Sequence, residues 1–534
     1  MKQFVSFMLC LLAFSAASAQ VTTSSMSGHV QDEQGAPVVG ALVLATHTPS
    51  GTEYSAIVDG TGNYRIMNMR SGGPYSVKIS MLGFQTVLNE GINIALGDNY
   101  VLDVTLPIES TDLDEVVVTG TRSSILNSDR AGVATNINNR QLNVLPTVSR
   151  SISDFTRLTP QAGNSGSFGG RDTRYNNVSI DGAAFAQRFG LSTSNNYPGG
   201  DAQPISLDAI QEISVNLTPF DIRQSNFTGA NINAVTKSGD NSYHATAYTF
   251  QRFKSMTGDR VQDATVANAK TTSRQTYGAS VGGPIIKNKL FFFINGELEY
   301  KSFLGNQWQP STDGVGSAEN KISQTTIADL ERVSNFLKEK YNYERGAYQN
   351  FGNSAADNYK IMARIDWNIS KNHKLMVRYN DVKSQDDNLV SGASTPGGVR
   401  LNNAGRNSIN SISFANTGYK QENRVRSITA ELNSVFSPKV SNKLLASFTN
   451  INDTRKTDGD LFPFVDIMRL GSDGKTYEGY MSFGTEIFSF NNGVLNNTFN
   501  ITDNVTIGLG QHTLTAGLSY ENQHFSNGYM REGT

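Results

Sequence analysis

Cysteine and charge are both scarce in this chain. Cys10 is the only cysteine in 534 residues, so a disulfide framework and a zinc site built from thiolates are excluded. Charged residues make up 17% of the sequence, below the roughly 25% that is usual in soluble domains. The 45 Lys and Arg residues against 47 Asp and Glu residues give a net charge of −2. Nucleic-acid-binding domains normally carry a strong basic excess, so no nucleic-acid partner is expected.

Sequence motifs of enzymes are missing too. The chain contains no G-x-x-x-x-G-K-[ST] phosphate loop and no G-x-S-x-G nucleophile elbow. Its six histidines never take the spacing of a metal-binding pair. We therefore expect a protein that is not an enzyme, with no catalytic residue, no cofactor and no bound metal.

No apolar run is long enough to cross a membrane as a helix, and the longest run lies at the amino terminus. Residues 4–14 are mostly apolar and follow the basic Lys2, and Ala17-Ser18-Ala19 supplies small residues at A-x-A spacing. This pattern predicts a cleaved secretory signal peptide over residues 1–19, because the run falls well short of the roughly 20 residues of a membrane-spanning helix. No later segment approaches that length. If the exported chain lies in a membrane, it must therefore cross it as a closed β-barrel.

Residues 22–107 predict a small antiparallel β-sandwich. Apolar residues recur at two-residue spacing, as in Tyr75, Val77 and Ile79, and the runs are separated by turn-forming stretches such as 59–63. The motifs at 27–32, 35–41 and 59–64 resemble the carboxypeptidase regulatory-like family. This resemblance implies a non-catalytic accessory domain, and the segment indeed lacks an H-x-x-E or H-E-x-x-H zinc signature.

A polar, acidic linker follows at 108–120. It contains Glu115, Val116, Val117, Val118 and Thr119, an extended segment suited to joining the sheet of another protein by strand addition. On composition alone, one more ordinary strand is the favoured interpretation. The position of the segment, after an accessory domain and before the next block, resembles the TonB box of outer-membrane receptors.

The block at 121–240 is rich in Gly, Asn, Thr and Ser. Its distinctive residues are Arg171, Asn176, Asn177, Asp181, Gly182, Pro219, Phe220, Asp221 and Arg223. In order and spacing, the motifs that hold them resemble the plug domain of TonB-dependent receptors, particularly the Oar-like receptors of Bacteroidetes. They depart from the SusC-type glycan receptors, which argues against a SusD-like lipoprotein partner. From the residues alone, a polar, loop-rich globule is better held inside a hydrophilic wall than in solvent; the alternative is a solvated α+β domain.

Residues 241–534 alternate with a period of two. Leu298 and Tyr300, for example, alternate with Glu297 and Glu299, which is the apolar-out, polar-in pattern of a transmembrane barrel. The segment 322–341 has helical spacing and predicts a helix in a long loop. About ten strands are expected, at 241–252, 273–283, 289–300, 357–368, 373–384, 408–418, 424–436, 439–452, 495–508 and 512–525. The fold class is therefore mainly β: an amino-terminal sandwich, an α+β plug and the first part of a large antiparallel barrel.

About ten strands are too few to enclose the plug. A globule of about 120 residues is roughly 35 Å across, and plugged lumens belong to barrels of about 22 strands. The chain also ends at Thr534 without an aromatic residue. We therefore expect an amino-terminal fragment of a longer protein, with about 12 further strands.

The resemblance implies a TonB-dependent receptor in the outer membrane of a Gram-negative bacterium. It would import an unidentified ligand, small or oligomeric, and would be energised by TonB with ExbB and ExbD through the segment 115–119. The amino-terminal domain and the plug would be accessible to the periplasm, and the barrel would contact outer-membrane lipid. The alternative is an outer-membrane surface protein for adhesion or envelope organisation. No substrate-binding residues are predicted.

Overall fold

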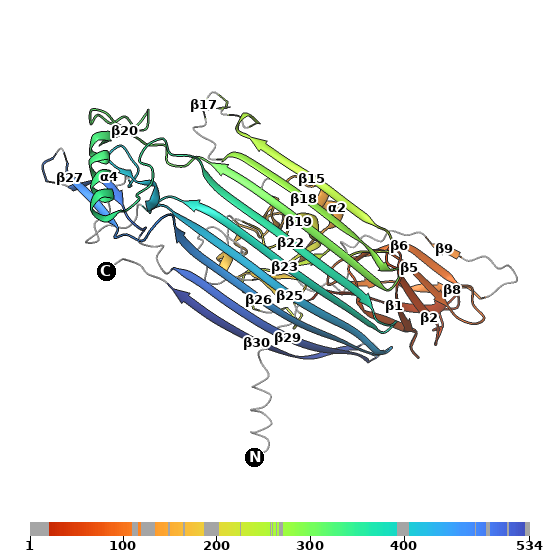
Figure 1. Cartoon of the computed structure of the whole chain (residues 1–534). Helices are drawn as coiled ribbons and strands as arrows, with labels where there is room; N and C mark the ends of the chain where they lie inside the picture. Colours follow the sequence, from red (N-terminus) through yellow and green to blue (C-terminus); the bar gives the residue numbers. More distant parts are fainter. Residues whose placement is uncertain are drawn as a thin grey trace, which may run out of the picture.

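The chain is described here from a computed structural model, and most of the described residues lie in β-strands (Figure 1). The structure describes residues 21–108, 116–118, 134–147, 150–163, 166–185, 202–219, 221–224, 226–256, 258, 260–262, 264–265, 271–391, 405–471, 473–475, 477–486, 492–509 and 512–528. The predicted fold class, mainly β with a large antiparallel sheet, is confirmed. No helix in this described part is both long and apolar enough to cross a bilayer.

The amino-terminal sandwich packs two sheets face to face around Met26, Val43, Tyr75, Val77 and Ile79, all fully buried. The first sheet consists of β1 (Ser24–Asp32), β4 (Asn63–Met69), β7 (Asn99–Val101) and β8 (Val104–Leu106). The second has the order β3 (Thr52–Ile57), β2 (Leu42–His47), β5 (Gly72–Ser80), β6 (Val87–Ile94) and β9 (Val116–Val118). The sheets are not wholly antiparallel as predicted, because β7 and β8 pair in parallel with β1, and β9 with β6.

The domain predicted as a plug, called the plug below, is a mixed sheet with short helices. Its strands, in order across the sheet, are β10 (Ala134–Asn138), β13 (Ile210–Asn216), β14 (Asn231–Thr236), β11 (Asn177–Ile180) and β12 (Ala183–Ala184). Its helical elements are α2 (Asn139–Val144), α3 (Ile152–Thr156), η2 (Thr173–Tyr175) and η3 (Leu207–Ala209). Asn138 and Ser151 begin α2 and α3 with reciprocal capping boxes, each of which satisfies two backbone N–H groups, that of the capping residue and that of the third helical residue.

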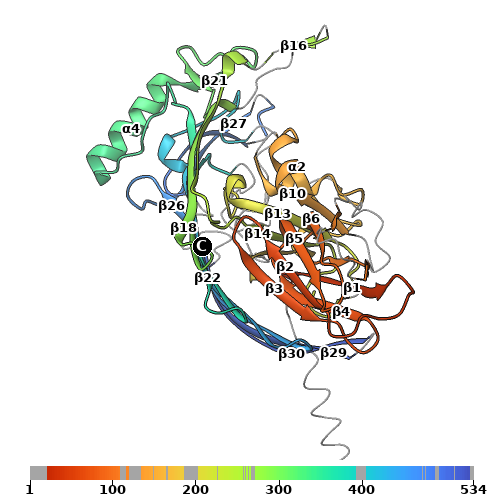
Figure 2. The same ribbon diagram turned by 90° about the vertical axis from the view of Figure 1, so that its right-hand side faces the viewer.

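A nine-stranded antiparallel sheet, called the wall below, curves around the plug (Figure 2). Its strands, in order, are β15 (His244–Phe253), β18 (Thr271–Ile286), β19 (Leu290–Phe303), β22 (Ser354–Asn368), β23 (His373–Asn388), β25 (Tyr419–Ser437), β26 (Val440–Thr457), β29 (Gly493–Leu509) and β30 (His512–Gly528). Polar side chains of the inner face and the plug cover each other. Glu297 is 4% exposed, whereas the neighbouring Leu298 on the outer face is 47% exposed. The predicted alternation therefore gives the correct faces.

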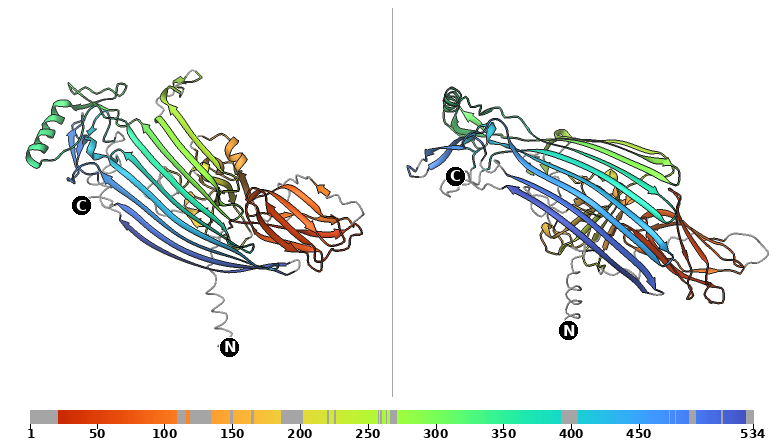
Figure 3. Two further views of the ribbon diagram at one scale, coloured as in Figure 1. Left: turned by 45° about the vertical axis from the view of Figure 1, so that its right-hand side comes forward. Right: turned by 60° about the horizontal axis from the view of Figure 1, so that its bottom comes forward.

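The two ends of the wall differ in the length of the connections that they carry. Tight turns such as 287–289 and 369–372 join strands at the end where the sandwich lies (Figure 3). Long connections emerge at the opposite end. One of them carries η4 (Lys254–Met256), β16 (Arg260–Val261) and β17 (Ala264–Thr265).

The other long connections build a small domain, called the cap below. Its elements are β20 (Gln309–Ser311), β21 (Ile322–Thr326), α4 (Ile327–Tyr341), β24 (Ile412–Ser413), η6 (Ala415–Thr417), β27 (Val465–Leu470) and β28 (Tyr477–Phe483). The predicted loop helix is present from Ile327, while 322–326 form a strand instead. The strand predicted at 408–418 is wrong as a wall strand, because Ile412 and Phe414 are buried in the core of the cap with Leu330, Leu337 and Met481.

Candidate functional site

The site begins at the turn between β11 and β12. Asp181 and Gly182 both have positive φ, 44° and 78°, the conformation that an Asp-Gly pair adopts in a tight primed turn. A Cβ on Gly182 would lie 2.8 Å from Cδ2 of Leu445 on β26. Two constraints therefore favour glycine at position 182: the backbone conformation and the close approach of the wall.

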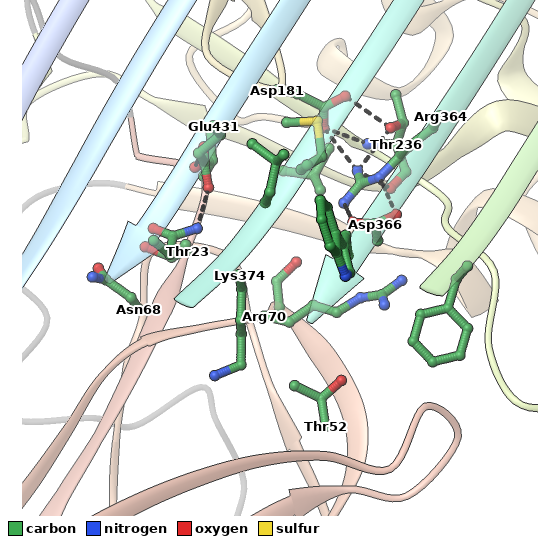
Figure 4. A pocket seen from close by; sticks show the side chains of 18 of the residues that line it. Thr23, Thr52, Asn68, Arg70, Asp181, Thr236, Arg364, Asp366, Lys374 and Glu431 are labelled. Atoms are coloured by element: carbon green, nitrogen blue, oxygen red, sulfur yellow. Dashed lines mark hydrogen bonds and ion pairs between the residues drawn. The ribbon is translucent and has the colours of Figure 1, made fainter. Parts of the chain in front are cut away.

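The turn aims the carboxylate of Asp181 at the wall. Its side chain is 1% exposed and accepts hydrogen bonds from the backbone N–H of Thr236 (2.9 Å) and from its hydroxyl (2.8 Å). Arg364 of β22 approaches with Nη1 3.4 Å from Oδ1, and Arg378 of β23 with Nη1 3.3 Å from Oδ2. Figure 4 shows Asp181, Thr236 and Arg364 together. One plug carboxylate thus binds two arginines of adjacent wall strands.

The charges of this cluster balance. Arg364 also forms a two-armed pair with Asp366 on its own strand, at 2.8 and 2.6 Å, and donates to the carbonyl oxygen of Thr236 at 3.0 Å. Two carboxylates, Asp181 and Asp366, therefore face two guanidinium groups. Buried charges are tolerated when they are paired in this way, and losing one member leaves another uncompensated.

A second polar contact joins the start of the described chain to the wall. Glu431 of β25 and Lys443 of β26 form a buried pair with 3.3 Å between Oε2 and Nζ. The hydroxyl of Thr22 donates to Glu431 at 2.5 Å and accepts from Lys443. The carbonyl oxygen of the preceding Val21 accepts from Asn233 of the plug strand β14. Residues 21–22 therefore lie between the plug and the wall.

The sandwich docks on both the wall and the plug. Beside the wall turns, Asn241, which precedes β15, donates its N–H to the carbonyl oxygen of Pro49 at 2.9 Å, and Asn368 at the end of β22 donates to the hydroxyl of Thr52 at 3.1 Å. At the plug, the N–H of Leu96 donates to Oε1 of Glu212 at 2.9 Å. The sandwich therefore covers the turn-side end of the plug.

A polar cavity of about 90 Å³ remains where the sandwich, plug and wall meet (Figure 4). Charged side chains from all three surround it: Arg70 from the sandwich, Asp181 from the plug, and Arg364, Asp366, Lys374 and Glu431 from the wall. Arg70 also donates to the hydroxyl of Ser238, and the ammonium of Lys374 lies 4.3 Å from the centre of the Tyr54 ring. The cavity is small, so the junction is suited to holding three parts together and not to binding a large ligand.

The other predicted plug residues are dispersed. Asn176 accepts from the N–H of Ala230 at 3.0 Å and donates to the carbonyl of Gly166 at 2.9 Å, and Asn177 donates to Asn231 at 3.2 Å. These bonds fasten the start of β11 to the segment leading into β14. Both asparagines are therefore placed to support the plug sheet.

The remaining motif residues lie away from the junction. Arg171 is exposed. Asp221 and Arg223 form a half-buried pair with 2.7 Å between Oδ2 and Nη2. Burial would raise the pKa of the Asp221 carboxyl, but hydrogen bonds and charge from Arg223 outweigh burial and hold this pKa below its ordinary value. Pro219 precedes this pair in the chain, and Phe220 lies outside the described residues.

The predicted TonB box is only partly within the described chain. Glu115 and Thr119 lie outside it, while Val116, Val117 and Val118 form β9 on the sandwich. Sequence reasoning did not single out the wall residues that meet Asp181. A usable signal existed, since Arg364, Asp366 and Arg378 stand on the inward face of central strands, where a charge requires a partner. Within the described residues, no cluster of three or more His, Cys, Asp or Glu side chains is placed to hold a metal ion.

Comparisons with known proteins agree with this architecture. Residues 25–107 match the carboxypeptidase regulatory-like domain, and residues 235–312 and 301–533 match the outer membrane beta barrel domain. The TonB-dependent transporter Oar of Myxococcus xanthus is 29% identical over 302 residues, which are 53% of this chain and 27% of that protein. The chain thus spans little more than a quarter of this curated relative. These matches confirm the predicted resemblance to Oar-like receptors.

Solved structures of siderophore receptors and of an outer membrane transporter are similar at low identity. The siderophore receptor PirA from Acinetobacter baumannii is 16% identical with a TM-score of 0.42, over 73% of this chain and 48% of that one. PirA from Pseudomonas aeruginosa is 10% identical with a TM-score of 0.44, over 75% and 49%. The transporter YddB from Escherichia coli is 11% identical with a TM-score of 0.39, over 74% and 58%.

Proposed function

Because the chain belongs to the outer membrane beta barrel domain family, which matches residues 235–312 and 301–533, we propose that it serves as a TonB-dependent receptor that imports a ligand across the outer membrane. The ligand enters from the end that carries the cap. TonB acts from the opposite end, where the sandwich and the wall turns lie. ExbB and ExbD energise TonB, and the segment 115–119 is the point of attachment.

The observation that carries this proposal is the polar contact between plug and wall formed by Asp181 with Arg364 and Arg378, called the seam below. An importer has to hold its plug firmly at rest and still release it under load. The Asp181 cluster suits both requirements, since its ion pairs and hydrogen bonds are specific in geometry. Water can replace them once they open, so their net contribution is far smaller than their gross strength. A plug held mainly by apolar contacts would instead expose apolar surface to water when it moves, which is unfavourable.

Strand addition explains how force enters the plug. TonB adds a strand to the extended segment 115–119, which precedes β10, the first plug strand. Tension along the chain then reaches the plug sheet at one edge, because β10 pairs with β13 alone among the described plug strands. The resulting shift loads the Asp181 contacts with β22 and β23 and opens a polar path beside the wall.

Deletion of residues 115–119 tests the proposal. We expect the deletion to abolish TonB-dependent depletion of small molecules from the growth medium, measured by mass spectrometry in cells with and without TonB. A matched deletion of residues 109–113 shortens the linker equally and should retain uptake. Equal uptake by both deletion variants, or uptake that does not depend on TonB, would refute the proposal.

A surface role is the second candidate, and the cap favours it. The cap has its own apolar core and a buried ion pair between Arg406 and Asp466 at 2.7 Å, so its described residues present a folded outer surface. Adhesion without transport would leave cell attachment unchanged when TonB is absent. Import instead predicts that loss of TonB abolishes uptake of the ligand.

A further inference from the structure

The segment Val116–Val118 lies on the edge of the sandwich and not in the plug. As β9 it pairs in parallel with β6, in the register Val87 with Val116, Leu88 with Val117 and Asn89 with Val118. The other side of β6 pairs with β5, so β9 takes the outermost place in the order β3, β2, β5, β6, β9. Without β9, this edge of the sheet would end at β6.

We infer that the outer edge of β6 is a docking surface for an extended strand, that its resident occupant is the segment 116–118, and that TonB competes with β6 for the same segment. The inference rests on the proposed function in taking TonB as the competing partner. Its physical basis is the backbone. A strand offers its N–H and C=O groups to neighbours on two sides, and the side that pairs with β6 is not available to a second strand.

The path of the chain keeps the segment 116–118 close to β6. Gln85 donates its N–H to the carbonyl oxygen of Pro107 at 2.8 Å, and Phe84 forms an isolated bridge with Ile108. The chain therefore leaves the sandwich beside the start of β6. Val116 follows Ile108 by 116 − 108 = 8 positions, a stretch of chain that can reach at most about 29 Å. A partner tethered this closely has an effective concentration on the order of millimolar.

The docked strand is short, which keeps the docking reversible. Three residue pairs in a parallel register form few hydrogen bonds, and a strand pairing of this size is marginal by itself. The effective concentration compensates for that weakness at rest. TonB then meets a segment that is exposed for only part of the time, and its apparent affinity falls in proportion to that fraction.

A crosslink tests the docking in the full chain. Leu88→Cys with Val117→Cys places thiols on register partners, which lie about 4.8 Å apart in neighbouring strands and within the range for a disulfide. The natural Cys10 is in the predicted signal peptide. We expect oxidation to form the bridge and to weaken binding of the purified carboxy-terminal domain of TonB by at least about tenfold, with recovery on reduction. Each single-cysteine variant should bind TonB equally under both conditions.

A release variant tests the competition. Successive N–H groups point to opposite sides of a strand, so one of Leu88→Pro and Asn89→Pro removes a donor that faces β9, and the other removes one that faces β5. The variant that loses the donor facing β5 should lower the unfolding temperature more, and this larger loss identifies it as the control. We expect the variant that loses the donor facing β9 to tighten TonB binding by about three- to tenfold, because a larger fraction of the segment is free.

The outcomes separate the inference from the proposed function. If wild-type chain binds TonB through 115–119 but neither the oxidised bridge nor the release variant changes the affinity, docking on β6 is irrelevant to TonB and the inference fails. If wild-type chain does not bind TonB at all, the proposed function fails. In that case, absence of the disulfide would also refute the docking of β9 on β6.

Discussion

The carboxylate of Asp181 and the guanidinium of Arg378 face each other across the boundary between plug and wall, with 3.3 Å between Oδ2 and Nη1. Arg378 is 0% exposed, and it has a second polar contact in the hydroxyl of Thr429 at 3.1 Å. Its charge is therefore balanced mainly by a residue 197 positions earlier in the chain (378 − 181). The seam is held by residues that meet only when the plug is in place.

Loss of the Asp181 charge should destabilise the plugged state. Asp181→Asn keeps the size of the side chain but leaves Arg364 and Arg378 with less negative charge, for which we expect a loss of about 3 kcal/mol. The midpoint of urea unfolding measures it. Asp172→Asn is the matched control, because Asp172 pairs with Arg174 on the exposed surface of the same domain. Equal midpoints for the two variants would contradict the assigned role of Asp181.

Replacement of Gly182 should separate backbone strain from wall contact. Gly182→Ala adds the cost of a positive φ, about 1–3 kcal/mol, and a clash with Leu445 at 2.8 Å. Gly170→Ala is the control, since Gly170 has a nearly equal φ of 76° and open space around it. We expect Gly182→Ala to lower stability more, and Leu445→Ala to recover the difference in a double-mutant cycle. If Leu445→Ala recovers nothing, the close approach of the wall has no energetic weight.

The sandwich should lose stability in mild acid through His47. Burial, reinforced by the charge of Arg70, lowers the pKa of His47 to about 3, from an ordinary value near 6.5. The unfolded chain therefore binds a proton that the folded sandwich excludes between these values. The contribution of His47 to the free energy of unfolding is fully present above pH 6.5. It falls as the pH drops, by about 2 kcal/mol between pH 7 and pH 5.

Two glutamine variants check this assignment. His47→Gln should flatten the pH dependence of sandwich unfolding, measured by pulse proteolysis in urea at pH 7 and pH 5. His29→Gln, on a different strand of the same domain, should keep the wild-type dependence. An unchanged slope in His47→Gln would assign the acid sensitivity to other groups.

The hydrogen bond between Glu212 of the plug and the Leu96 amide should stabilise the contact between plug and sandwich. Its carboxylate accepts the N–H of Leu96 at 2.9 Å and is buried. Glu212→Ala should speed hydrogen exchange of the Leu96 amide by about tenfold, because the hydrogen bond is worth about 1–2 kcal/mol. Glu212→Gln retains an acceptor oxygen and serves as the control. If the Leu96 amide exchanges equally in both variants, the plug does not protect this contact.

Much of the architecture could be predicted because it depends on local patterns. The alternation of Glu297 and Leu298 assigns the faces of a strand from two-residue periodicity alone. The strand predicted at 408–418 failed because Ile412 and Phe414 are apolar for a different reason: they fill the core of the cap. Periodicity cannot tell which apolar centre a short segment joins.

The site was only half predictable. Asp181 and Gly182 were predicted only as members of motifs that resemble a plug domain, although an Asp-Gly pair also marks a tight turn. Their partners Arg364 and Arg378 come from distant strands, and the register that brings them together is set by the whole sheet. The valine run at Val116–Val118 predicts an extended strand, but its pairing with β6 could not be predicted, since backbone hydrogen bonds carry no side-chain code. The role of 115–119 toward TonB stays a prediction.

The cap stands apart from the wall in one respect that affects how such a protein diversifies. Because Leu330, Leu337 and Phe414 give the cap its own apolar centre, its outward residues contribute little to the pairing of the long strands. Under the proposed function, substitutions on the outer surface of the cap would change which ligand is bound without lowering the stability of the wall. Ligand recognition and mechanical strength would then belong to separate parts of one polypeptide, and each could change without loss of the other.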